Sequence, residues 1–195
     1  MKHKHPIILA SSSVFRKELL SRLDLPFETD SPDIDESQLL GESPEDYVKR
    51  LSLEKAQAVA HRHKHALIIA SDQCSVVAGK INGKPGHHDV AIQQLQESSG
   101  QQVSFLTGLC VMDSETGDYQ LDQVPYFVNF RELNQTEIER YLIKEKPYNC
   151  AGSFKSEGLG ITLFKRMHGD DPTALIGLPL IRLCEMLRSY EIKLP

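Results

Sequence analysis

The sequence lacks three things: a long hydrophobic run, paired cysteines and an excess of basic residues. No apolar stretch approaches the roughly 18 residues of a membrane span, and the N-terminus MKHKHPIILASSS lacks the apolar core of a signal peptide. The four cysteines lie more than 30 residues apart without a CxxC pair. Such spacing is typical of buried free thiols in a reducing compartment, not of a disulfide framework or a zinc site. We therefore expect a cytoplasmic protein with no membrane contact.

The charge balance excludes a general affinity for polyanions. With 22 Lys and Arg against 27 Asp and Glu, the formal net charge is −5 at pH 7. No overall basic field draws such a chain to nucleic acid, so an anionic ligand needs a local basic pocket. The chain also lacks a Walker loop, because NGKPG does not match GxxxxGK[ST].

Strand and helix patterns alternate along the chain, without repeats or an obvious linker. Strands are predicted over residues 7–10, 25–29, 67–71, 74–78, 102–112, 119–131 and 161–165, and helices over 13–23, 43–61, 89–98, 134–144 and 178–190. This order predicts one α/β domain over residues 1–195, with a mixed twisted sheet flanked by helices and two lobes around a central cleft.

Asp72 interrupts two apolar runs in the segment LIIASDQCSVV. A hydrophobic core excludes a charge unless a partner holds it, so Asp72 needs an explanation. One hypothesis is a catalytic or metal-binding carboxylate at a strand end. The other is a turn or capping carboxylate in a bend at Ser71–Gln73.

Three serines and two cations begin the first helix, in the segment LASSSVFRKELL. Cations oppose the helix dipole at an N-terminus unless an anion lies there. Free amides, the Ser13 hydroxyl and the Arg16 guanidinium together suit phosphate oxygens. The alternative is that Ser13 only caps the helix while Arg16 and Lys17 face solvent.

Further lysines and carboxylates complete a hypothetical polyphosphate site. Lys55 flanks the apolar face of its helix, Lys84 follows a hairpin, and Lys155 lies in GSFKSEG, although each is also compatible with a solvated surface lysine. The acidic segment DIDES provides Asp33, Asp35 and Glu36. Carboxylates without a histidine cluster suit Mg²⁺ or Mn²⁺ and can activate water, although a solvated acidic loop is the simpler alternative.

Taken in order, eight motifs resemble the Maf-like nucleoside triphosphate pyrophosphatases over nearly the whole chain. They are ILASSSVFRKELL, DIDES, LSLEKA, IIASDQ, GKP, SFLTGL, CAGSFKSEGLG and LIGLPL. The resemblance implies hydrolysis between the α and β phosphates with a divalent metal, Mg²⁺ or Mn²⁺. It implies that Asp72 activates water, that Glu36 helps to position the metal or the water, and that the phosphates are held by Ser13, Arg16, Lys55 and Lys84. A homodimer is compatible with it.

Three positions resemble the branch of this family that hydrolyses 7-methyl-GTP: Phe15, Gln73 and Glu157. N7-methylguanine is a cation, and stacking on Phe15 is worth ~0.5–2 kcal/mol. Glu157 suits the N1–H and 2-amino donors of guanine, and Gln73 is expected to add a base contact. Alternatively, Phe15 is a core aromatic in a stripe with Leu19 and Leu23, and Glu157 is a surface carboxylate.

The resemblance leaves two other functions open. One is a pyrophosphatase for dTTP, UTP or a broad set of modified nucleotides. The other is a non-catalytic regulator of septum formation and cell division, which needs no catalytic Asp72.

Overall fold

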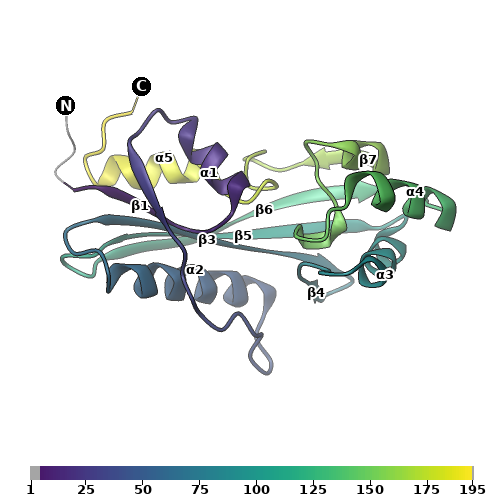
Figure 1. Cartoon of the computed structure of the whole chain (residues 1–195), viewed down its shortest axis with the longest axis horizontal. Helices are drawn as coiled ribbons and strands as arrows, with labels where there is room; N and C mark the ends of the chain where they lie inside the picture. The colour runs from purple at the N-terminus through teal and green to yellow at the C-terminus, as the bar shows by residue number, and fades with distance from the viewer. Residues whose placement is uncertain (1–4, 195) are drawn as a thin grey trace.

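The computed structural model describes residues 5–194, which form one α/β domain around a seven-stranded mixed sheet (Figure 1). The strands are β1 Ile7–Ala10, β2 Phe27–Asp30, β3 Leu67–Val77, β4 Lys80–Asn82, β5 Gln102–Asp113, β6 Tyr119–Phe130 and β7 Phe164–His168. The helices are α1 Val14–Ser21, α2 Pro44–Ala60, α3 His88–Ser98, α4 Gln135–Glu145 and α5 Leu180–Ser189. The predicted fold class is confirmed.

The sheet is parallel at one side and antiparallel at the other. Its order is β2-β1-β3-β5-β6-β7, with β4 paired to β3 off this path. Strand β1 runs parallel to both β2 and β3, whereas β3, β5, β6 and β7 pair antiparallel in turn. The long strands β3, β5 and β6 extend through both halves of the molecule, which ties the two halves into one domain (Figure 1).

Helices cover both faces of the sheet at the β1 end. Alternate residues of a strand point to opposite faces. Accordingly, Ile7 and Leu9 join the core cluster with α1 and α5, whereas Ile8 and Ala10 join the cluster with α2. All four are buried, which explains why β1 reads as a continuous apolar run. A further core lies in the other half, where β5 and β6 meet α3 and α4.

Several predicted boundaries were wrong. The two strands predicted on either side of Asp72 are one continuous strand, β3, and Asp72 pairs in register with Gly108 of β5. Backbone pairing with β5 carries the strand through the polar residue. The strand predicted over 161–165 begins later, at Phe164, because Leu159–Leu163 form a 3₁₀ helix.

All four cysteines are free thiols, as predicted. Two of them are buried, Cys74 and Cys110, but Cys150 and Cys184 are only partly buried, contrary to the prediction of buried thiols. Among residues 5–194, no helix is both long and apolar enough to cross a lipid bilayer.

Candidate active site

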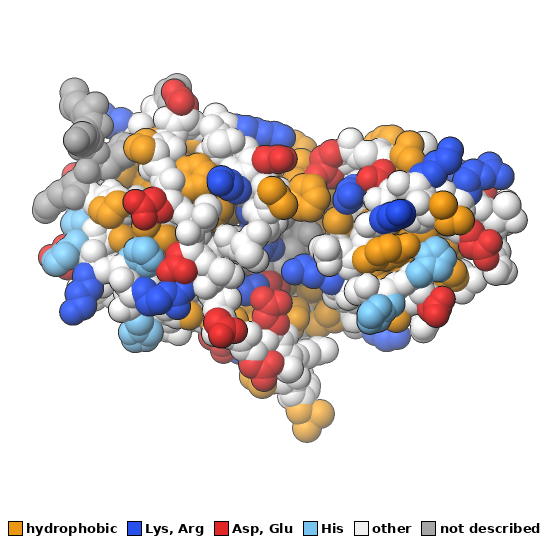
Figure 2. All heavy atoms as spheres, viewed as in Figure 1, with side chains coloured by type: hydrophobic (Ala, Val, Ile, Leu, Met, Phe, Trp, Pro, Cys, Tyr) orange, Lys and Arg blue, Asp and Glu red, His pale blue; other side chains and the backbone are white. Residues whose placement is uncertain are grey.

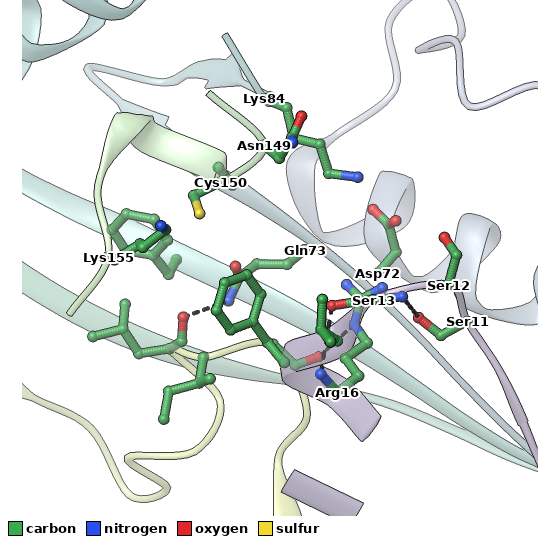
Figure 3. Close-up of a pocket in the computed structure, with 18 of the residues that line it drawn as sticks. Ser11, Ser12, Ser13, Arg16, Asp72, Gln73, Lys84, Asn149, Cys150 and Lys155 are labelled. Carbon is green, nitrogen blue, oxygen red and sulfur yellow. Dashed lines mark hydrogen bonds between the residues drawn. The ribbon is translucent and has the colours of Figure 1, made fainter. Parts of the chain in front are cut away.

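A pocket of about 490 Å³ lies between the two halves of the molecule. Figure 2 shows a hollow near the middle of this face, with basic and acidic side chains at its rim. In the close-up, Asp72, Arg16 and the three serines lie on one side, and Cys150 and Lys155 lie on the other (Figure 3). All nine of the predicted site residues line it: Ser13, Phe15, Arg16, Glu36, Lys55, Asp72, Gln73, Lys84 and Glu157.

Asp72 is held inside the strand by α2. Its side chain contacts Lys55, whose Nζ donates to Asp72 Oδ1 over 2.5 Å. The Asp72 N–H donates to Ser52 Oγ over 3.0 Å, and Ser52 Oγ donates to the Val48 carbonyl. Asp72 is only 6% exposed, so the turn-carboxylate interpretation was wrong.

A glycine lets α2 approach the sheet this closely. A Cβ at Gly108 would overlap the Val48 carbonyl oxygen and would lie 2.5 Å from Ser52 Oγ. Any larger residue at position 108 would therefore push α2 away from β3. The position of Lys55 opposite Asp72 depends on this close contact.

Lys55 lies between two carboxylates. It is 4% exposed, and its Nζ is 2.7 Å from Glu36 Oε1 as well as in contact with Asp72. Partial burial by itself would raise the pKa of Glu36, but the hydrogen bond and charge of Lys55, helped by Lys84 and Arg16, lower that pKa. Both carboxylates thus contact the same cation, Lys55. An apolar core would not contain such a group of charges.

Arg16 lines the pocket. The alternative that its side chain faces solvent was therefore wrong. Its Nε donates to the Gly177 carbonyl over 2.8 Å. Burial lowers the pKa of the Arg16 guanidinium, while the charges of Asp72 and Glu36 oppose that shift. Ser13 does cap α1, accepting from the Arg16 N–H, and it also lines the pocket. Lys17 is exposed, as the alternative supposed.

The three residues predicted to contact the base occupy different surroundings. Phe15 belongs to none of the core clusters and is half-buried at the pocket, whereas Leu19 is buried in the core. Glu157 is exposed and accepts from the Ser156 hydroxyl. The core-stripe alternative for Phe15 is therefore wrong.

The Gln73 amide nitrogen is occupied by the protein. It donates to Thr107 Oγ1, to the Ala174 carbonyl and to the Leu175 carbonyl, over 3.0, 2.7 and 3.1 Å. Two backbone carbonyls beside one amide group require its nitrogen, not its oxygen, to face them. Gln73 therefore offers a ligand only an acceptor oxygen.

The donor set suits a hard divalent cation shared with a ligand. Glu36 and Asp72 bring carboxylate oxygens to one point, and oxygen donors are those that Mg²⁺ and Mn²⁺ prefer. Residues 5–194 contain no group of three His, Cys, Asp or Glu side chains that would enclose an ion. Mg²⁺ usually takes one or two carboxylates and completes its shell with water and phosphate oxygens, so the two residues fit such an ion.

Asp33 and Asp35 stay outside the pocket among the described lining residues. Asp35 instead accepts from the Ser37 N–H in a local turn. Of the three carboxylates in the acidic segment DIDES, only Glu36 therefore lines the pocket.

Sequence reasoning missed several pocket residues. Tyr47 donates its hydroxyl to the Glu36 carbonyl over 3.0 Å, and burial together with Asp72 and Glu36 raises the pKa of Tyr47 to about 12. Tyr47 lies in the first turn of α2, which begins at Pro44. No local pattern in the sequence indicates that its hydroxyl contacts the acidic segment. Asn149, Cys150 and Leu175–Gly177 also line the pocket, from loops that have no regular periodicity.

The fold and this pocket define a class: α/β proteins with a site between two halves that combines carboxylates, one of them buried, with cations for an anionic ligand. The chain belongs to the Maf-like protein family, whose model matches residues 6–190. The resemblance seen in the sequence motifs is confirmed.

Several relatives carry one and the same name. A protein of Pseudomonas savastanoi pv. phaseolicola is 55% identical over 97% of this chain and 98% of its own length. A Pseudomonas fluorescens Pf-5 protein is 56% identical over 97% and 99%, and an Alcanivorax borkumensis protein is 53% identical over 97% and 96%. Each of the three is named 7-methyl-GTP pyrophosphatase.

Proposed function

We propose that this protein is a 7-methyl-GTP pyrophosphatase, which hydrolyses the bond between the α and β phosphates and releases pyrophosphate and the monophosphate. The observation that carries the proposal is the buried Asp72, paired with Lys55 at the wall of a pocket lined by cations. The relatives named for this activity, similar over nearly their whole length, support it.

Asp72 is the proposed general base. A carboxylate that reaches the pocket from a rigid central strand can accept the proton of an attacking water with little reorganisation. The contact with Lys55 Nζ fixes the position of this carboxylate at the pocket wall. In the substrate complex we expect Lys55 to contact phosphate oxygens as well as Asp72.

The remaining cations are proposed to hold the polyphosphate. Arg16 is fixed through Nε by the Gly177 carbonyl, which leaves its terminal nitrogens as donors. Ser13, at the N-terminus of α1, adds hydroxyl and backbone donors in the positive field of the helix end. Lys84, exposed at the pocket rim, provides a further mobile charge for the leaving pyrophosphate.

Glu36 and Asp72 are the proposed ligands of a divalent cation, Mg²⁺ or Mn²⁺. When bound, such an ion neutralises phosphate charge and lowers the pKa of coordinated water. The protein's own part is to hold both carboxylates at the pocket and to keep Glu36 ionised, because Lys55, with Lys84 and Arg16, lowers the pKa of Glu36.

We also propose the base contacts. Phe15 offers a ring face to the cationic N7-methylguanine, and Glu157 offers acceptors to its N1–H and 2-amino groups. Gln73 offers only an acceptor, which also suits the donors of the guanine edge. We expect the reaction to occur in the cytoplasm, and the homodimer stays a prediction.

Pyrophosphate release from a nucleotide panel tests the proposal. With Mg²⁺ or Mn²⁺, we expect 7-methyl-GTP to be preferred over GTP, dTTP, UTP and CTP, and Asp72→Asn to lower kcat by about a thousandfold or more because the base is lost. Asp33→Asn makes the same charge change outside the pocket and should retain activity.

Each of the other results of this experiment would contradict a different part of the proposed function. A preference for dTTP or UTP would overturn the base contacts and favour the pyrimidine-nucleotide alternative. Absence of release from every nucleotide would overturn the enzymatic proposal and favour the regulatory role.

A further inference from the structure

Glu145 organises the loop that carries Glu157, although it lies at the end of α4 in a different part of the chain. Its Oε2 accepts from the Leu159 N–H over 2.7 Å. A Cβ at Gly158 would lie 2.6 Å from the same oxygen, so the loop passes directly over the carboxylate. The Glu145 side chain is only 14% exposed.

Lys155 is the cation that accompanies this carboxylate. Its Nζ lies 3.5 Å from Glu145 Oε1 and 3.5 Å from the Glu145 carbonyl oxygen, at the pocket wall opposite Asp72 (Figure 3). Its backbone N–H donates to Tyr141 Oη, which holds the start of the loop against α4. Lys155 is 30% exposed, so solvent does not fully screen its charge.

These charges act on the same part of the pocket. Burial raises the pKa of the Cys150 thiol, and the charges of Lys155, Glu157 and Glu145, followed by that of Lys84, each act on it as well. Cys150 lines the pocket beside Lys155. Any base bound at this end therefore experiences the charges of Glu145, Lys155 and Glu157 as well as that of Lys84.

Resting on the proposed function, we infer that Glu145 is a specificity-determining residue that neutralises Lys155 and so makes the base end of the pocket more negative. Glu145, Glu157 and Lys155 together carry a net charge of −1, and Lys84, which also lines the pocket, is the same in every variant compared below. An unpaired Lys155 would cancel the charge of Glu157 and would repel N7-methylguanine, a cation, more than neutral guanine. Glu145 thus acts through Lys155, without touching the substrate.

Four proteins test the inference: wild type, Glu145→Gln, Lys155→Met and the double variant. Glutamine keeps an oxygen for the Leu159 N–H, and methionine keeps the apolar stem of lysine and the backbone N–H that bonds to Tyr141, so only the Nζ contacts to Glu145 are lost. The measurement is the ratio of kcat/KM for 7-methyl-GTP to kcat/KM for GTP, together with the Tm of each variant.

We expect Glu145→Gln to lower the ratio by about five- to tenfold, mainly through KM for 7-methyl-GTP. Lys155→Met should keep or raise the ratio, and the double variant, with the wild-type net charge, should return to within about twofold of wild type. The loss in Glu145→Gln should diminish at high salt, because salt screens the charge of Lys155.

A double variant as impaired as Glu145→Gln would overturn the inference, since a merely structural role is not rescued by removing Lys155. Equal losses for both nucleotides would overturn it as well. If wild type prefers 7-methyl-GTP and the four ratios agree, only this inference falls. If wild type does not prefer 7-methyl-GTP, the proposed function falls, and this inference falls with it.

Discussion

At the scale of single residues, the pair of Asp72 and Lys55 indicates function more than stability. Both side chains are almost fully buried. Removing two charges from water costs several kcal/mol, and the attraction between them often only balances that cost. A stable core at this point of β3 would use apolar residues instead. We therefore interpret the pair as functional, with little or no net gain in the free energy of unfolding.

Phe15 carries a prediction at this scale. Phe15→Leu keeps an apolar side chain but removes the ring face, so we expect kcat/KM for 7-methyl-GTP to fall by about 2- to 30-fold, the equivalent of ~0.5–2 kcal/mol. The value for GTP should change less, since unmethylated guanine is neutral. Phe15→Trp should raise the preference, because indole is the better cation–π surface.

Equal losses for the two nucleotides would contradict the stacking contact. Such a result would indicate that Phe15 shapes the pocket without recognising the charge of the base.

At the scale of elements, a clamp fastens the acidic loop (residues 31–43) to α2. Arg50 on α2 donates from Nε and one terminal nitrogen to both oxygens of Glu42, and it also donates to the Ser37 carbonyl. With the Tyr47 contact to the Glu36 carbonyl, the clamp holds Glu36 over Lys55. The hydrogen bond from Arg50 is the main cause that lowers the pKa of Glu42.

The clamp predicts a pH-dependent stability. The Glu42 side chain is 6% exposed, so at pH 7 Glu42→Gln should lower the free energy of unfolding by about 1 kcal/mol. Because the folded pKa of Glu42 is lowered, its contribution is present above the unfolded pKa of about 4.3 and is lost as pH falls through the folded pKa. Urea unfolding at several pH values should show the difference from wild type shrinking below about pH 4.

Glu28→Gln, at an exposed position of β2, is the control and should match wild type throughout. The clamp would be contradicted if the free energy of unfolding of Glu42→Gln stayed below that of wild type by a constant amount down to pH 3.

At the scale of the whole molecule, the pocket joins segments from both ends and both halves of the chain. Arg16 bonds to Gly177 across 161 positions of sequence, and Gln73 bonds to Ala174 across 101. The segment 173–177 thus closes the site from the C-terminal side through its backbone carbonyls. A nucleotide in the pocket would contact both halves at once, because residues of both line it.

Ligand binding should therefore stabilise the molecule as one unit. With 7-methyl-GTP and Mg²⁺ at about 100 times Kd, the inactive Asp72→Asn variant should gain about 2.7 kcal/mol, which raises Tm by about 5–10 °C. Calorimetry should show a single transition. The nucleoside 7-methylguanosine at the same concentration should shift Tm less, since it leaves the phosphate contacts unused. Two transitions, with only one of them shifted by the nucleotide, would contradict this prediction.

The sequence by itself determined the alternation of strands and helices and the residues that could carry the chemistry. Apolar runs and helical patterns report burial of neighbours along the chain, which is why the strand Ile7–Ala10 and a helix that begins near residue 43 were predicted correctly. The isolated charge of Asp72 was also visible, because a core disfavours it.

Only the tertiary structure decided how those residues meet. It showed that β3 runs unbroken through Asp72, because β5 supplies the pairing. It also showed that Glu145 lies under the loop of Glu157, and that Gln73 is turned by the carbonyls of Ala174 and Leu175. Such contacts join segments far apart in the chain and leave no local periodicity, so packing alone sets them.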